Sequence, residues 1–79
     1  MRLPRDISGD ELIRLLQKFG YQTDRQTGSH VRLTRKVADG EHHITVPKHK
    51  NLRLGTLNSI LQDVANQLGV DKDVILQHR

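Results

Sequence analysis

The sequence predicts an α+β domain in which two long helices pack on one face of a three-stranded antiparallel sheet. Apolar residues recur at helical spacing near the start of the chain and again in its second half. Between these segments, apolar and polar residues alternate as they do in half-buried strands. The helices must cover the apolar sheet face, because no other segment is able to bury it. The expected order is α-β-β-β-α with a short C-terminal helix, in a single domain over residues 1–79.

The first helix is predicted over residues 9–19. Ser8 is suited to cap its free amide groups, and Glu11 is suited to return the hydrogen bond in a capping box. Gly20 stands where a left-handed residue commonly ends a helix. The apolar stripe of this helix consists of Leu12, Leu15, Leu16 and Phe19.

Three short strands follow, separated by turn signals at residues 28–29 and 38–40. Residues 21–27 are polar and suit an exposed or edge strand. Residues 30–36 and 42–46 alternate, so each strand has one apolar and one polar side. The apolar face is expected to hold Val31, Leu33, Ile44 and Val46, and the polar face His30, Arg32, Thr34, His43 and Thr45.

A basic connection over residues 48–54 leads to the second helix, which we expect to begin near Gly55. Gly69 is its expected C-cap. Asp71 is suited to cap a short final helix. The apolar stripe of the second helix consists of Leu57, Ile60, Leu61, Val64 and Leu68.

The composition narrows the classes of function. Lysine and arginine number 13 against 9 aspartates and glutamates, a formal net charge of +4 that favours an anionic partner such as nucleic acid. The chain has no cysteine and no apolar stretch near the ~20 residues of a membrane span. We therefore expect a cytoplasmic protein without disulfides, signal peptide or membrane contact. Phe19 and Tyr21 are the only Phe, Trp or Tyr residues, which argues against a base-stacking platform.

Five short phrases occur in order along the chain. They are Ser8-Gly9-x-Glu11-Leu12, Gly20-Tyr21, Gly28-Ser29-His30, Thr45-Val46-Pro47-x-His49 and Gly55-Thr56-Leu57-x-x-Ile60-Leu61. Together they resemble the HicA family of toxin ribonucleases, and the resemblance covers essentially the whole chain. A bare Gly-Ser-His is common by chance, whereas five ordered phrases on one predicted scaffold are not.

The resemblance implies a fold like that of the double-stranded-RNA-binding domain. It also implies an mRNA interferase, an endonuclease that cleaves RNA and blocks translation, and a cognate HicB-type antitoxin protein. The functional histidine of the family is the one in Gly-Ser-His, which is His30 here. The second helix, counted to Gly69, is longer than is usual in the family, and this affects the expected geometry of the partner.

RNA cleavage also suits His30 on chemical grounds. RNA carries its own nucleophile, the 2′-hydroxyl, so cleavage needs a base, an acid and charge stabilisation, and no metal is strictly required. An imidazole with an ordinary pKa of ~6.5 exchanges protons near neutral pH. Gly28 lets the backbone approach a phosphate, and Ser29 offers an amide or a hydroxyl to a phosphate oxygen. Without the resemblance, a turn followed by a solvated histidine is the commoner interpretation.

The basic loop holds a second candidate group. His49 lies between Lys48 and Lys50, with Arg53 close behind. It is either a second acid or base or one of several groups that bind RNA, and the residues alone leave both open. We expect Lys48, Lys50 and Arg53, together with Arg32 on the polar strand face, to bind phosphate.

The adjacent His42 and His43 are expected on opposite faces of their strand, so they do not easily chelate one metal. His42 is predicted to be a partly buried structural residue, and His43 to join the polar face. Asp39 and Glu41 are the only carboxylates near them in the sequence. We therefore expect neither a metal site nor a cofactor.

A non-catalytic double-stranded-RNA-binding module is the alternative from a different class, because it uses the same fold and basic loops. Such a module recognises the shape of a duplex through Lys and Arg, so replacing one histidine leaves its activity largely intact. A helix-turn-helix DNA-binding protein is disfavoured by the β-patterned segments between the two helices.

Overall fold

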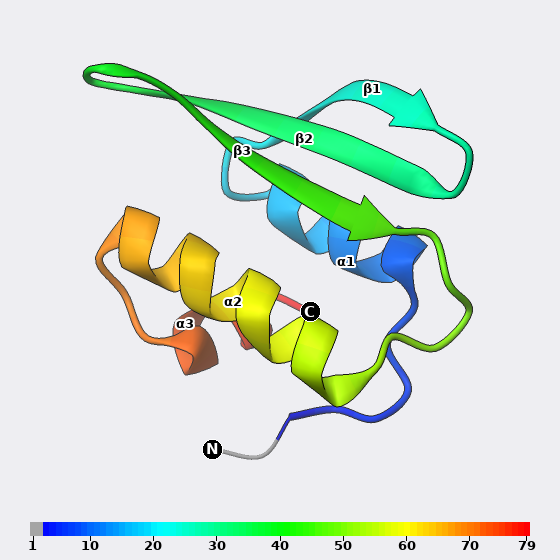
Figure 1. Cartoon of the computed structure of the whole chain (residues 1–79). Coiled ribbons are helices and arrows are strands. Elements are labelled where there is room, and N and C mark those ends of the chain that lie inside the picture. The colour runs from blue at the N-terminus through cyan, green and yellow to red at the C-terminus, as the bar shows by residue number, and fades with distance from the viewer. Residues whose placement is uncertain (1–2) are drawn as a thin grey trace.

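The computed structural model describes residues 3–79 and has the predicted α+β architecture (Figure 1). Both long helices lie on the same side of a three-stranded antiparallel sheet, in layers that are clear in Figure 1. The elements are α1 (Gly9–Gln17), β1 (Gln22–Thr27), β2 (His30–Val37), β3 (Gly40–Pro47), α2 (Leu54–Leu68) and α3 (Lys72–Leu76).

The sheet order is β1-β2-β3, so β2 is the central strand and β1 and β3 are its edges. The turn between β2 and β3 is tighter than expected: Val37 pairs with Gly40, and Gly40 belongs to the strand with φ +142°. β1 is exposed along its whole length, as the polar sequence predicted, and its register shifts between Thr23 and Arg25. Such a bulge bends an edge strand and makes it a poorer template for pairing with another chain.

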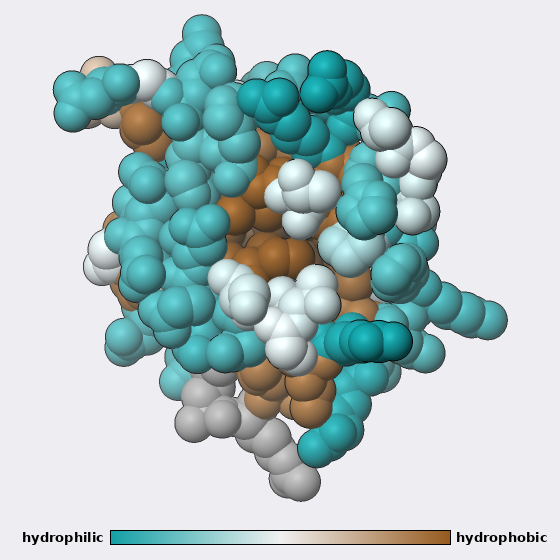
Figure 2. Space-filling model, viewed as in Figure 1, coloured by the Kyte–Doolittle hydropathy of each residue, from teal (hydrophilic) through white to brown (hydrophobic). Residues whose placement is uncertain are grey.

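The core lies between the helices and the apolar sheet face. All four predicted inward strand residues are buried, which confirms the alternation that assigned them. The helix stripes are buried with them, except that Phe19 and Leu68 are only partly covered. Figure 2 shows brown apolar atoms in a recess between β3 and α2, bordered by white groups of intermediate hydropathy and, outside them, by teal polar groups. Elsewhere on this face, polar side chains cover most of the surface (Figure 2).

The ends of α1 differ in part from expectation. Ser8 caps the helix by accepting a hydrogen bond from the Glu11 N–H at 3.0 Å. In a capping box, the Glu11 carboxylate would accept a hydrogen bond from the backbone N–H of Ser8. It instead accepts hydrogen bonds from Arg79 near the C-terminus. The helix ends at Gln17, two residues early, and a turn carries the chain through Gly20 at φ +94°.

The later helix boundaries follow the sequence closely. α2 begins at Leu54, one residue before the expected start, and Gly69 ends it in the left-handed conformation at φ +71°. Asp71 occupies the N-cap position of α3, but its side chain makes no capping hydrogen bond there. The prediction for Asp71 is therefore right about position and wrong about the capping contact.

Candidate functional site

Two segments that the sequence analysis singled out lie side by side at one end of the sheet. His30 opens β2 and is paired in register with Pro47, the last residue of β3. One residue outward, the Lys48 N–H donates to the Ser29 carbonyl at 2.6 Å. The Gly28-Ser29-His30 corner and the start of the basic loop are thus joined by backbone contacts. The structure brings Lys48 and His49 next to this corner.

The N-terminus of α1 holds the same loop from the other side. The Gly9 N–H donates to the His49 carbonyl at 2.9 Å, and the Leu52 N–H donates to the Ile7 carbonyl at 2.9 Å. A Cβ on Gly9 would collide with the Pro47 carbonyl oxygen and lie 2.9 Å from the Lys48 Cα. Glycine is needed at this position because the helix and the loop backbone are in direct contact.

The sequence predicts Gly9 at the start of a helix but does not reveal this contact. The contact joins segments about 40 residues apart, and no local pattern encodes such a pairing. One signal was present: glycine is a poor helix former, so a glycine in the first turn suggests a packing reason.

His30 is exposed, whereas its neighbours Val31 and Leu33 are buried. This confirms that His30 belongs to the polar side of the sheet. Gly28 has φ +59°, a backbone conformation that disfavours side chains, yet a Cβ there would meet nothing within 4 Å. The space beside Gly28 is open, so a ligand is able to approach the corner closely.

The candidate cations differ in how far they are engaged. Lys48 lies 3.5 Å from the Asp10 carboxylate, and Arg32 lies 3.5 Å from that of Asp24. Lys50 and Arg53 are exposed, and within residues 3–79 their side chains form no hydrogen bond or ion pair. Because they need not give up an existing partner, these two are the more readily available to a phosphate.

His42 and His43 face opposite sides of β3, as expected. The His42 side chain is only 15% exposed, and its Nε2 lies 3.0 Å from the Asp63 carboxylate. Its Nδ1 lies 2.6 Å from the Tyr21 hydroxyl. A carboxylate only accepts, so Nε2 donates to Asp63, while Nδ1 and the Tyr21 hydroxyl share the second hydrogen bond of the ring. His42 therefore ties β3 to α2 and to the start of β1, in the structural role predicted for it.

Burial raises the pKa of the Tyr21 hydroxyl above its ordinary value of 10.0. The positive charge of Arg35 lowers this pKa by a smaller amount, and the negative charge of Asp63 raises it slightly. The hydroxyl is therefore protonated at neutral pH, and its hydrogen bond to His42 is kept.

On the polar face, His43 belongs to a hydrogen-bonded group that the sequence did not reveal. Thr34 Oγ1 donates to the Asp24 carboxylate at 3.0 Å and lies 2.9 Å from His43 Nδ1. The Arg32 Nε–H donates to the same Nδ1 at 3.4 Å, so this one ring nitrogen contacts both Arg32 and Thr34. Arg32 Nη2 lies 3.1 Å from both ring nitrogens of His43.

Within the described part of the chain, no group of three or more His, Asp or Glu side chains is arranged to hold a metal ion. Among the helices of residues 3–79, none has the length and apolar character needed to cross a membrane.

The fold and this corner define a small α+β domain with an exposed histidine beside a basic loop. The family model described as the HicA toxin of bacterial toxin-antitoxin systems matches residues 9–70. Since the match spans most of the 79 residues, the chain belongs to the HicA toxin family. Searches of curated proteins and of solved structures gave no match. The family assigns the protein to the toxins of toxin–antitoxin systems.

Proposed function

We propose that this toxin is a metal-independent endoribonuclease that cleaves mRNA and blocks translation, with His30 as its catalytic acid or base. The observation that carries the proposal is the backbone hydrogen bond from Lys48 to Ser29, which joins the His30 corner to the basic loop. One phosphate at this junction would have an exposed imidazole, backbone amides and several cations around it.

The proposed reaction uses the 2′-hydroxyl of the substrate as nucleophile. A histidine removes its proton, the 2′-oxygen attacks phosphorus, and the bond from phosphorus to the 5′-oxygen breaks. A second group protonates the departing 5′-oxygen, so the products carry a 2′,3′-cyclic phosphate and a 5′-hydroxyl. Positive charge nearby stabilises the phosphorane as it forms. Lys48, Lys50, Arg53 and Arg32, with the Gly28-Ser29 backbone, are the proposed phosphate-binding groups.

His49 is the proposed partner of His30, either as the second proton carrier or as a further phosphate-binding group. Its backbone is held by Gly9, while its side chain is exposed. A fixed backbone with a free ring is compatible with both roles, so kinetic data on variants must separate them.

We further propose that a HicB-type antitoxin neutralises the toxin in the cytoplasm by covering the His30 corner and the basic loop. Lys50 and Arg53 offer exposed positive charge to acidic side chains. The same cations that bind RNA would then bind the antitoxin, and the two ligands would exclude each other.

The test is cleavage of an unstructured RNA by purified protein in EDTA. His30→Ala is expected to lower the rate by ~10²–10⁴-fold. Because His30 is exposed, we expect stability to change by less than ~0.5 kcal/mol. His78→Ala, an exposed histidine of the C-terminal segment, is the control and should cleave as the unmodified protein does. Normal cleavage by His30→Ala would reject its catalytic role, and binding of duplex RNA without any cleavage would favour the non-catalytic module.

A further inference from the structure

The polar sheet face continues from His30 along the whole of β2. Alternate residues of the strand share a face, so Arg32, Thr34 and Lys36 follow His30 on the same side. Their partners on β3 are Thr45, His43 and Glu41. At ~3.3 Å per residue, Thr34 lies about 13 Å along the strand from His30. The helices occupy the opposite face, so within residues 3–79 no element covers this one.

Arg32 and His43 form a pair of flat groups in the middle of this face. A nitrogen 3.1 Å from both ring nitrogens cannot lie in the ring plane without colliding with the carbon between them. The Nη2 atom of Arg32 therefore lies over a face of the imidazole ring. The Asp24 carboxylate holds Arg32, and Thr34 holds His43. The two side chains remain 39% and 38% exposed, so a further planar group is able to reach them.

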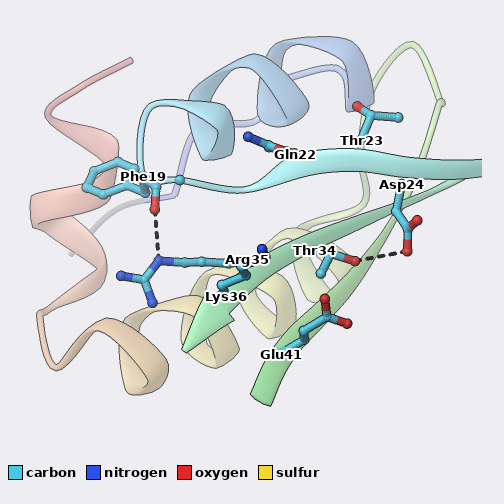
Figure 3. A pocket seen from close by; sticks show the side chains of 9 residues that line it. Phe19, Gln22, Thr23, Asp24, Thr34, Arg35, Lys36 and Glu41 are labelled. Carbon is cyan, nitrogen blue, oxygen red and sulfur yellow. Dashed lines mark hydrogen bonds between the residues drawn. The ribbon is translucent and has the colours of Figure 1, made fainter. Parts of the chain in front are cut away.

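A hollow of about 650 Å³ lies where β1 begins beside β2 (Figure 3). Its lining includes Asp24 and Thr34, which contact Arg32 and His43, and it continues past the sheet edge to Phe19 and Arg35. Figure 3 shows Asp24 and Thr34 hydrogen-bonded on one side, with Glu41 on the next strand. The Arg35 Nε–H donates to the Phe19 carbonyl at 3.0 Å and closes the other side. The hollow lies within the ~300–1,000 Å³ typical of small-molecule sites. Its lining supplies both donors and acceptors, chiefly Gln22, Asp24, Thr34, Arg35, Lys36 and Glu41.

We propose that single-stranded RNA lies along β2, with one base stacked on the Arg32–His43 pair and another in this hollow. The inference deepens the proposed ribonuclease function and rests on it. The distance of about 13 Å corresponds to about four nucleotides of a stacked strand at 3.4 Å each, and to fewer if the strand is extended. Bases on one side of the scissile phosphate would thus contribute to binding.

The chemistry of the face favours a single strand over a duplex or an acidic peptide. The carboxylates of Asp24 and Glu41 repel phosphates and acidic side chains, but they accept hydrogen bonds from base amino groups. In a duplex, the Watson–Crick edges and the faces of the bases are hidden. The scarcity of Phe, Tyr and Trp argued against base stacking, yet guanidinium and imidazole planes also stack on bases.

The test measures binding of two probes in EDTA by fluorescence anisotropy, in the His30→Ala background so that the RNA stays intact. One probe is an unstructured eight-nucleotide RNA, and the other is the same backbone without bases. We expect the RNA with bases to bind about tenfold more tightly, from stacking of at least one base. This preference should fall at least fivefold in His43→Ala and in Arg32→Lys, which keeps the charge but loses the plane. Arg14→Ala, on the exposed side of α1, is the control and should keep the preference.

The inference would be overturned if the variants lost equal affinity for both probes. It would also be overturned if neither variant lost the preference for the RNA with bases. A duplex of the same length that binds more tightly than the single strand would also overturn it. The binding experiment does not measure cleavage, so none of these outcomes tests the ribonuclease proposal, which the cleavage assay with His30→Ala tests separately. The unmodified protein could fail to cleave RNA while the preference for bases is observed and is lost in His43→Ala and Arg32→Lys. The catalytic proposal would then fail, and the proposed path of single-stranded RNA along β2 would stand.

Discussion

The His30 corner and the Tyr21–His42–Asp63 cluster both centre on histidines, but they are built in opposite ways. At the corner, backbone hydrogen bonds hold the chain while the imidazoles of His30 and His49 are exposed. In the cluster, both ring nitrogens of His42 have fixed partners and most of the side chain is buried. A ring that must exchange protons with a substrate needs free nitrogens, whereas a ring that joins elements needs occupied ones.

After His30→Ala, the largest effect is expected where the backbone of the corner is disturbed. Gly9→Ala pushes α1 away from the Pro47–Lys48 backbone, because the new methyl group has no free space. We expect a loss of stability of about 1–3 kcal/mol. Misplacement of the loop should also lower the rate of RNA cleavage on the order of 100-fold. Urea denaturation and single-turnover cleavage measure the two effects separately.

Gly55→Ala is the matched control for that variant. Gly55 lies in the first turn of α2, and a Cβ there meets nothing within 4 Å. Alanine favours a helix over glycine by up to about 1 kcal/mol, so this variant should be slightly stabilised and fully active. Wild-type cleavage and stability in Gly9→Ala would contradict the role assigned to Gly9.

For the cluster, His42→Ala should lower stability without removing chemistry. It takes away both hydrogen bonds of the ring and leaves the buried Tyr21 hydroxyl without its partner, at a cost of about 1–3 kcal/mol. Cleavage, corrected for the folded fraction, should stay within about twofold of the unmodified protein. If His42→Ala instead lost cleavage at unchanged stability, the comparison between the two regions would be wrong.

The pH dependence of stability tests the structural role of Tyr21 in the cluster. Its pKa is raised in the folded protein, so its contribution to stability is complete below the unfolded pKa of about 10 and is lost as the pH rises through the folded pKa. The free energy of unfolding should therefore fall more steeply above pH 10 in the unmodified protein than in Tyr21→Phe. Denaturation curves at pH 9, 10 and 11 measure this, and parallel losses in both proteins would show that Tyr21 is not responsible.

The smallest effects are expected from the free cations of the loop. Lys50→Ala and Arg53→Ala should each weaken RNA binding and reduce its salt dependence by ~0.7 in logarithmic slope for a single strand. The maximal cleavage rate should change little, because these residues are proposed to bind phosphate and not to transfer protons. Binding titrations between low and moderate salt, with Arg14→Ala as the control, give the slopes. An unchanged slope would place the loop outside the RNA path.

Local patterns predicted most of the fold. The period of two along β2 and β3 assigned His30 to the polar side and Leu33 and Ile44 to the core, and the burial of these residues confirms it. Gly69 was a reliable helix end, because a left-handed C-cap depends on only a few adjacent residues. The structural role of His42 was also predicted correctly, because the alternation along β3 places its side chain on the helix side of the sheet.

Most of the missed contacts join residues far apart in the chain. Glu11 binds Arg79, 68 positions away, and so leaves the local capping box. Gly9 contacts the loop after β3, and Asp63 on α2 contacts His42, 21 positions earlier. The contact between Arg32 and the His43 ring depends on side-chain rotamers as well as on register. Periodicity reports which face a residue occupies, but it does not report what it meets there.

The most direct test of the ribonuclease account is the chemistry of the cut ends. After the cleavage site in an RNA has been mapped in EDTA, one 2′-deoxy nucleotide is placed immediately 5′ of the scissile phosphate, and the products of both RNAs are compared. Attack by the 2′-hydroxyl predicts a 2′,3′-cyclic phosphate and a 5′-hydroxyl from the all-ribose RNA, and no cleavage at that site in the deoxy-substituted one. Cleavage of the substituted RNA to leave a 5′-phosphate would contradict it, because water and not the 2′-hydroxyl would then be the nucleophile.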